Sequence, residues 1–278
     1  MTVAVVVDTA SALPRDVAAA NGITLVPMGL SIGGLPVAES ALTMEELIAR
    51  FDEGVTTSGA SPGDFAKAIE ISQDGDGVVV ITLASELSST YRSALVGAEE
   101  AGGLVRVIDS CTAAGAEGLI ALAAARMAAT GATIDQVEAA ARRALGEVIL
   151  VGALSTLDYL VRGGRIPAAA GWAARRFNVQ PLIELRDGRV RPLRPAFSRE
   201  AALERMLSQW RRSEVPGADL HVVAMHSLGA DDARALLDRI RSEIRPATSF
   251  LSGFGNTLVA HTGPGLVGLA WWWERPLT

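Results

Sequence analysis

Short apolar runs alternate with polar turns along the first half of the chain. Three runs are rich in β-branched residues: Val3–Val7, Val78–Leu83 and Leu104–Ile108. Runs of this kind are typical of strands buried on both faces of a parallel sheet. Each is followed by a polar turn and a stretch of helical composition. The pattern therefore predicts βαβ units and a parallel sheet.

Other signals in this half predict smaller elements. A helix is expected after Pro14, a strand over Ile23–Leu30, a hairpin tip at Gly33-Gly34 and an alanine-rich helix over about Ala116–Ala129. The segment Thr56–Phe65 holds four hydroxyl residues, two glycines and a proline, which predicts a loop. Within it, Ser61-Pro62 is typical of a helix start.

The second half has a different pattern. Asp187-Gly188 between two apolar-bearing runs predicts a β-hairpin. The remaining segments predict helices over about Ala168–Arg176, from Ser198 to Arg212 and over Ala230–Glu243, with strands at His221–Met225 and Ala247–Leu251. We therefore expect an α/β protein of two domains. Residues 1–150 would form a parallel-sheet α/β domain, and residues 151–278 an α+β domain with a mixed sheet.

Composition narrows the class of protein. Of the 278 residues 49% are hydrophobic and 20% charged, which is typical of a globular chain with a large core. The net charge of -6 disfavours nucleic acid as a partner. Cys111 is the only cysteine, which indicates a reducing compartment. With neither a signal peptide nor an apolar run of membrane-spanning length, we expect a cytoplasmic protein without stable membrane insertion.

Hydroxyl-rich turns follow several strands. They are Asp8–Ser11, Thr56–Ser61, Ser85–Thr90 and Ser110–Thr112. Because the carboxyl ends of parallel strands lie along one edge, these turns can converge there on a ligand. Neutral donors without a nearby base suit holding a carboxylate or phosphate. The alternative is that each hydroxyl merely caps its own helix, as Ser88 or Ser89 would do for the helix that follows.

Catalytic and cofactor motifs are weak in this chain. We find no G-x-S-x-G elbow and no phosphate-binding loop with lysine. Its three histidines lack metal-ligand spacing, so no metal is expected. Gly263–Gly268 matches the letters G-x-G-x-x-G but contains Pro264 and has no room for a βαβ unit. We expect no cofactor.

Taken together, several segments resemble the DegV family of bacterial fatty-acid-binding proteins. They are VVVDTAS, TTSGASPGDF, LASELSSTYRSA, VRVIDSCTAAGAEG, LDYLVRGGRI, QPLIELRDGRV and AHTGPGLVG, which together span almost the whole chain. Their order and spacing make the set specific.

The resemblance implies a two-domain protein that holds one long-chain fatty acid between its domains. Family positions that bind the carboxylate fall on Thr57 and Ser88, and the histidine near the same head group falls on His261. We extend this expected carboxylate site to three neighbouring hydroxyls, Ser58, Ser89 and Thr90. We also expect an apolar tunnel with walls near Met28, Ile32, Leu160, Ile166 and Leu266.

The resemblance further implies a carrier and not an enzyme. Such a carrier presents its fatty acid to a separate fatty acid kinase for lipid transport and phospholipid synthesis, and Arg165 would face that kinase. Ser89, Ala60 and Phe197 depart from the family pattern. Two alternatives stay open. One is an enzyme acting on a small phosphorylated or carboxylated substrate with His261 as general base, and the other is a scaffold without ligand.

Overall fold

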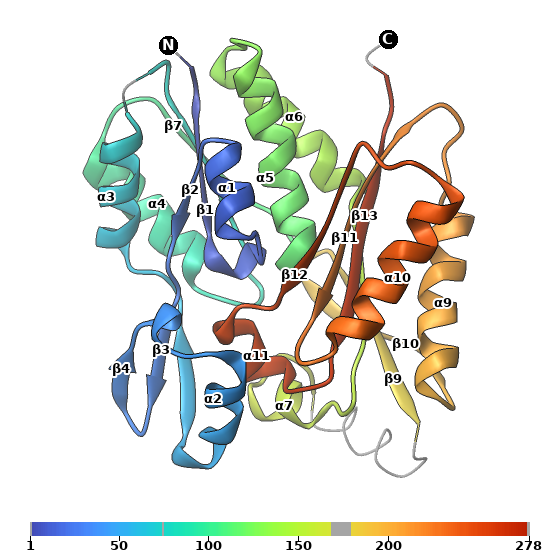
Figure 1. The fold of residues 1–278 in the computed structure, drawn as a ribbon. Coiled ribbons are helices and arrows are strands. Elements are labelled where there is room, and N and C mark those ends of the chain that lie inside the picture. The colour runs from blue at the N-terminus through green and yellow to red at the C-terminus, as the bar shows by residue number, and fades with distance from the viewer. Residues whose placement is uncertain (1, 74, 168–178, 277–278) are drawn as a thin grey trace.

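The parallel sheet predicted from the apolar runs is present. The structure is a computed structural model, and it describes residues 2–73, 75–167 and 179–276. Strands β2 (Ile23–Val26), β1 (Ala4–Asp8), β6 (Val78–Thr82) and β7 (Val105–Asp109) are parallel neighbours in that order. Every residue of β6 is buried, as its unbroken apolar run predicts. Helices α1 (Arg15–Ala20), α3 (Pro62–Ser72) and α4 (Thr90–Ala101) lie in the same part of the molecule (Figure 1).

A three-stranded antiparallel sheet lies below the parallel sheet in Figure 1. It contains β4 (Leu35–Val37), β3 (Gly29–Ile32) and β5 (Val55–Ser58). The turn at Gly33-Gly34 has positive φ at both glycines, which fits the predicted hairpin tip. Helix α2 (Met44–Ala49) comes between β4 and β5, and Thr43 caps it with a capping box.

Two predictions in this region are wrong. The strand expected over Ile23–Leu30 is two strands in different sheets, because Pro27 follows β2 and has no N–H to continue the ladder. The loop expected over Thr56–Phe65 begins as strand β5. This strand forms because it pairs with β3, and the local composition of hydroxyls and glycines does not reveal such a pairing.

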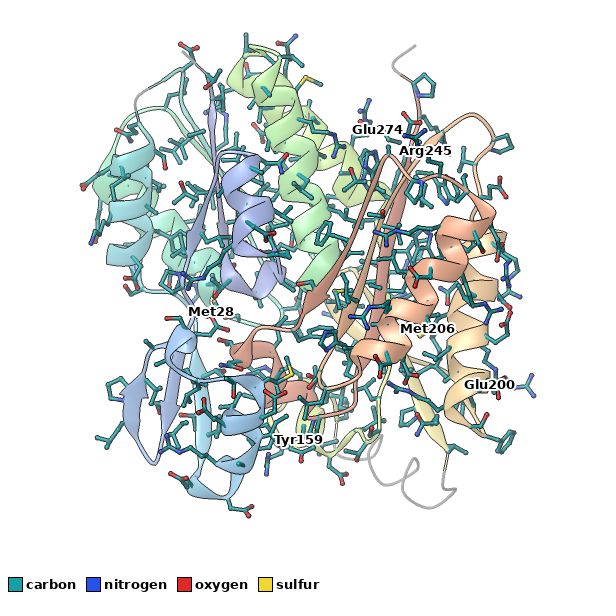
Figure 2. All side chains as sticks on the ribbon, viewed as in Figure 1. Met28, Tyr159, Glu200, Met206, Arg245 and Glu274 are labelled. Carbon is teal, nitrogen blue, oxygen red and sulfur yellow. The ribbon has the colours of Figure 1, made fainter. Side chains whose placement is uncertain are left out.

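The second half forms a mixed sheet of six strands. In order they are β10 (Arg189–Ala196), β9 (Gln180–Arg186), β8 (Ile149–Ala153), β13 (Val267–Glu274), β11 (Asp219–His226) and β12 (Thr248–Gly253). Only the β11–β12 pair is parallel. Helices α9 (Arg199–Arg212) and α10 (Ala230–Glu243) cover one face. Met206 of α9 is fully buried in the core between them and the sheet (Figure 2).

Helix α5 (Ala114–Ala129) lies between the parallel sheet and the six-stranded sheet. It is buried nearly all round, which explains a composition dominated by alanine. Two of its glycines allow close approach to different neighbouring segments. A Cβ on Gly115 would lie 2.7 Å from Met225 Sδ, and one on Gly118 would lie 2.9 Å from Ser11 O. Small residues therefore let both sheets pack on one helix.

The next helix, α6 (Ile134–Glu147), was not expected from the sequence, although Thr133 and Gln136 form a capping box at its start. Short helices α7 (Asp158–Arg162) and α11 (Asn256–Thr262) connect strands of the six-stranded sheet. The helix predicted near Ala168–Arg176 lies outside the described residues. No helix in the described ranges combines the length and apolar character needed to cross a bilayer.

The two larger sheets divide the described chain near the predicted boundary. Strands up to β7 belong to the first two sheets, and strands from β8 on belong to the six-stranded sheet. Because α5 packs on both larger sheets, the division into domains at residue 150 stays a prediction.

Helices α3 and α4 pack closely at Gly97, and this contact gives a test of the fold. A Cβ at Gly97 would lie 2.5 Å from Pro62 O and 2.7 Å from Phe65 Cβ, so the backbone must move. We expect Gly97→Ala to destabilise the protein by about 1–3 kcal/mol in urea unfolding.

The matched control for this test is Gly146→Ala in α6, where a Cβ meets nothing within 4 Å. In a helix this change is expected to be neutral or stabilising. Equal stabilities of the two variants would contradict the close packing of α3 on α4.

Candidate functional site

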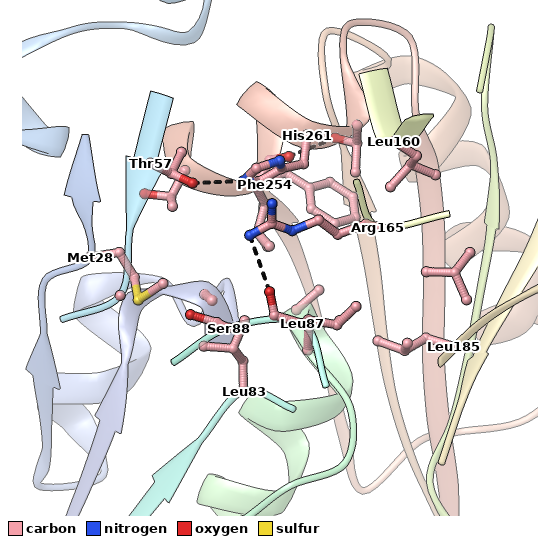
Figure 3. Close-up of a pocket in the computed structure, with 18 of the residues that line it drawn as sticks. Met28, Thr57, Leu83, Leu87, Ser88, Leu160, Arg165, Leu185, Phe254 and His261 are labelled. Atoms are coloured by element: carbon pink, nitrogen blue, oxygen red, sulfur yellow. Dashed lines mark hydrogen bonds between the residues drawn. The ribbon is translucent and has the colours of Figure 1, made fainter. Parts of the chain in front are cut away.

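One cavity of about 390 Å³ collects residues from many separate segments (Figure 3). Its walls come from β5, the β6–α4 turn, the start of α5, strands β8–β10, α7, and the segment from Phe254 through α11. The cavity therefore lies where both halves of the chain meet. Its lining is mostly apolar, with polar side chains from Thr57, Ser58, Ser88, Ser89, Arg165, Thr257, His261 and Thr262.

Thr57 and His261 form the central polar contact of the cavity. Thr57 Oγ1 lies 2.7 Å from His261 Nε2, although the residues are 204 positions apart in the chain. Burial, with a smaller contribution from the charge of Arg165, lowers the pKa of His261 to about 4. The imidazole is therefore neutral at pH 7. With its hydrogen on Nε2 it donates to Thr57 and leaves the Thr57 O–H free to donate to an anion.

Ser88 comes from the turn between β6 and α4. Backbone bonds to Ala84 O from Leu87 N (3.0 Å) and Ser88 N (3.2 Å) form this turn. Ser88 Oγ also accepts from Thr90 N at 3.3 Å, so Ser88 supports the helix start as well as lining the cavity. Ser89 makes no side-chain cap bond, and its φ of -73° is an ordinary value that tolerates a Cβ.

The predicted carboxylate residues fall into two groups. Thr57, Ser58, Ser88, Ser89 and His261 all line the cavity. Thr90 is fully buried and is not among the lining residues. Its hydroxyl lies 2.8 Å from Ser88 Oγ and 3.5 Å from Met28 Sδ, so it contacts the residues that form the wall.

The other hydroxyl-rich turns do not bring their hydroxyls to the cavity. Ala10 lines it, whereas Thr9 and Ser11 do not. Ser110 Oγ donates to Thr112 O at 3.2 Å and accepts from Thr112 N at 3.3 Å. The predicted convergence therefore holds for the turns that carry Thr57 and Ser88, and local bonding explains Ser110.

Arg165 also lines the cavity, a position that the sequence pattern did not reveal. Its guanidinium donates to Leu87 O at 3.1 Å and to Gly163 O, and it lies beside His261 (Figure 3). Burial lowers its pKa from the ordinary value. The side chain thus places a cation next to the polar end of the cavity, while its expected contact with a partner stays a prediction.

The apolar wall includes a row of three side chains. In the sheet register Leu150 pairs with Leu185, and Leu185 pairs with Val190. Paired residues point to the same face, so this row extends across β8, β9 and β10. Figure 3 shows Leu185 on the side of the cavity away from Thr57. Further apolar lining comes from Leu83, Leu87, Leu160, Phe254 and Leu258.

The β9–β10 hairpin closes the cavity against the first half of the chain. Asp187 and Gly188 both have positive φ, as the predicted Asp-Gly turn requires. Gly188 N donates to Cys111 O at 2.7 Å, and the exposed Arg189 lies 3.4 Å from Glu86. Of the wall residues predicted from the sequence, Met28 and Leu160 line the cavity. Ile32, Ile166 and Leu266 are themselves buried in the main core and do not line the cavity, although Arg165 next to Ile166 does.

Comparison with known protein families shows which family this chain belongs to. The family model described as "Uncharacterised protein, DegV family" matches residues 2–274. This chain belongs to the DegV family. A DegV domain-containing protein of Streptomyces coelicolor is 36% identical over 273 residues, covering 96% of this chain and 97% of that protein.

Two relatives of this DegV protein are described as binding fatty acids. A "Fatty acid-binding protein" of Thermotoga maritima is 31% identical over 216 residues, 76% of this chain and 75% of that protein. The solved structure "Fatty Acid Binding of a DegV family Protein from Thermus thermophilus" superimposes with a TM-score of 0.90 at 28% identity. It covers 98% of this chain and 100% of that one.

Proposed function

We propose that this DegV protein binds one long-chain fatty acid in the cavity. The carboxylate would be held by the hydroxyls of Thr57 and Ser88, with Ser58 and Ser89 beside them and His261 behind Thr57. The tail would lie along the apolar row. The observation that carries the proposal is the cavity itself, which is mostly apolar and has hydroxyls and a neutral imidazole at one end, with the Arg165 guanidinium beside them. The stated ligands of two relatives support the same class.

The energetics assign different roles to tail and head. A palmitate-sized tail of roughly fifteen carbons gains on the order of 10 kcal/mol at ~0.8 kcal/mol per buried CH₂. Association and chain ordering remove at least several kcal/mol of that. Each hydrogen bond to the carboxylate adds about 1.5–3 kcal/mol. The tail therefore sets most of the affinity, and the hydroxyls fix the orientation.

The same geometry supports a carrier more than an enzyme. A general base works best with a pKa near the operating pH, and burial holds the pKa of His261 at about 4. We therefore propose a cytoplasmic, non-enzymatic carrier that presents the carboxylate to a separate fatty acid kinase for phospholipid synthesis. Hydroxyl contacts leave the carboxylate oxygens more available for transfer than a bidentate ion pair would. Support for the kinase comes only from the family resemblance.

Mass spectrometry of the ligand released from protein purified from a bacterial host tests the function. We expect close to one long-chain fatty acid per chain, and exchange for added palmitate. Protein that carries no fatty acid and binds none that is added would contradict the proposal.

The apolar row predicts how the protein selects chain length. Leu185→Ala enlarges the cavity beside Leu150 and Val190, so the tightest-binding saturated acid should become longer by about two carbons or more. Competition binding with a C10–C20 series measures this shift. Leu193→Ala is the control, because this half-buried leucine of the same hairpin packs in the core on the opposite face of the sheet. The same shift in both variants would exclude the row as the determinant.

A further inference from the structure

Glu39 connects two walls of the cavity without lining it. It lies in the short helix η2 (Glu39–Ala41) and is half-buried. Its carboxylate accepts three hydrogen bonds, from Thr9 Oγ1 at 2.7 Å, Thr257 N at 3.0 Å and Thr257 Oγ1 at 2.9 Å. Its backbone oxygen accepts from Asn256 Nδ2 at 3.0 Å, and the same Nδ2 donates to Leu42 O at 2.8 Å.

These bonds supply the N-terminal cap of α11. Gly255 at the N-cap position has no side chain, so the cap comes from Glu39 in a distant part of the chain. A carboxylate at this end is favourable because the helix N-terminus carries partial positive charge. The approach is close, since a Cβ on Gly255 would lie 2.8 Å from Glu39 Oε1. A helix of seven residues is too short to be stable alone, so outside contacts set its position.

The position of α11 decides where His261 lies. Thr257 and His261 are one helical turn apart, on the same face of α11, and both line the cavity. The bonds to Thr257 therefore fix the position of α11, and with it the position of the imidazole that contacts Thr57. On the other side, Thr9 Oγ1 accepts from Met28 N at 3.0 Å, and Met28 lines the cavity as well. The carboxylate of Glu39 thus fixes both the wall formed by α11 and the wall at Met28.

We propose that Glu39 is a positioning residue that keeps His261 against Thr57 and so gives the cavity its preference for a carboxylate over a neutral head group. This inference rests on the proposed fatty-acid function. It differs from a general stabilising role in one respect: loss of Glu39 changes the recognition of the head group and leaves the apolar row that binds the tail in place.

The test compares palmitate with hexadecan-1-ol, which has the same tail length and no charge. In competition binding, Glu39→Ala should reduce the preference for palmitate over the alcohol by about tenfold. This factor corresponds to roughly 1.4 kcal/mol, which is the size expected for one weakened hydrogen bond to the carboxylate. Affinity for the alcohol should change by less than about threefold. Glu39→Gln keeps one side-chain oxygen that accepts from Thr257, so it should retain most of the preference.

Glu45→Ala is the matched control, because Glu45 is an exposed glutamate at the start of α2. It should leave both affinities unchanged. Nitrogen-15 NMR of the His261 ring gives a second readout, and its tautomer signals should shift in Glu39→Ala and not in Glu45→Ala. If Glu39→Ala does not fold, the near-isosteric Thr9→Val removes one of the three bonds and should lower the preference less.

An equal loss of palmitate and alcohol binding in the Glu39 variants, or no change in either, would overturn the positioning role alone. Failure of the unmodified protein to bind palmitate would overturn the proposed function and this inference with it.

Discussion

The Thr57→Ala, Ser88→Ala double variant is expected to bind a long-chain fatty acid about 10- to 1,000-fold more weakly than the unmodified protein. Each hydroxyl bonded to a carboxylate contributes about 1.5–3 kcal/mol, and each 1.4 kcal/mol is a factor of ten in affinity. The lower end of the range applies if water replaces the lost hydroxyls. Titration with a fluorescent fatty acid, followed by displacement with palmitate, measures the loss.

The control for this variant is Thr56→Ala, Ser85→Ala. These residues are close neighbours of Thr57 and Ser88 in the same strand and turn, but they are exposed and do not line the cavity. Both double variants should melt at similar temperatures. Unchanged palmitate affinity in Thr57→Ala, Ser88→Ala would remove the two hydroxyls from the head-group site.

Stability against urea is expected to contain a component that decreases as the pH rises from about 5 to 7. The cause is a pair of fully buried carboxyl groups, Asp8 at the end of β1 and Glu117 in α5. Asp8 accepts from Leu83 N and Ala10 N, both at 2.9 Å, and the carboxyl of Glu117 lies close enough to affect its titration. Burial raises the pKa of Asp8 to about 7. Burial, and then the charge of Asp8, raises the pKa of Glu117 well above its usual range.

The direction of the pH effect follows from proton linkage. The unfolded chain releases these protons near pH 4, whereas the folded protein keeps at least one of them up to about pH 7. Between those values the folded state binds more of these carboxyl protons, so the contribution of the pair to stability is complete below pH 4 and is lost as the pH rises. The lowered pKa values of His221, His226 and His261 act in the opposite direction, because below about pH 6.5 the unfolded chain binds imidazole protons that the folded protein does not. One such proton changes the free energy of unfolding by roughly 1 kcal/mol per pH unit.

Glu117→Gln tests this assignment. An amide cannot ionise, and it can donate to the Asp8 carboxylate, so the slope of stability against pH between 5 and 7 should become more positive than in the unmodified protein, by roughly 1 kcal/mol per pH unit. Glu99→Gln, at an exposed position of α4, is the control and should keep the full slope. An unchanged slope in Glu117→Gln would show that the buried pair does not contribute to the pH dependence of stability.

Local sequence patterns predicted those elements that form through interactions between residues close together in the chain. The apolar runs gave β1, β6 and β7, and Ser198 and Asp187-Gly188 correctly marked a helix start and a hairpin. Strand β5 was missed because its hydroxyl-rich sequence is ordered by pairing with β3. Helix α6 was missed although its capping signal is present in the sequence.

The site was predictable only in part. Thr57, Ser88 and His261 were found through family motifs, because no local pattern connects residues 204 positions apart. The inward position of Arg165 and the row of Leu150, Leu185 and Val190 depend on turn geometry and strand register. The bonds from Glu39 to α11 likewise arise from tertiary packing. Composition and spacing carry no signal for such contacts.

A crystal structure of the protein with bound palmitate tests the central claim most directly. We predict the carboxylate within hydrogen-bond distance of Thr57 Oγ1 and Ser88 Oγ, and the tail against Leu185 between the two halves of the chain. A ligand bound outside this cavity, or with its carboxylate at the Leu185 end, would contradict the account.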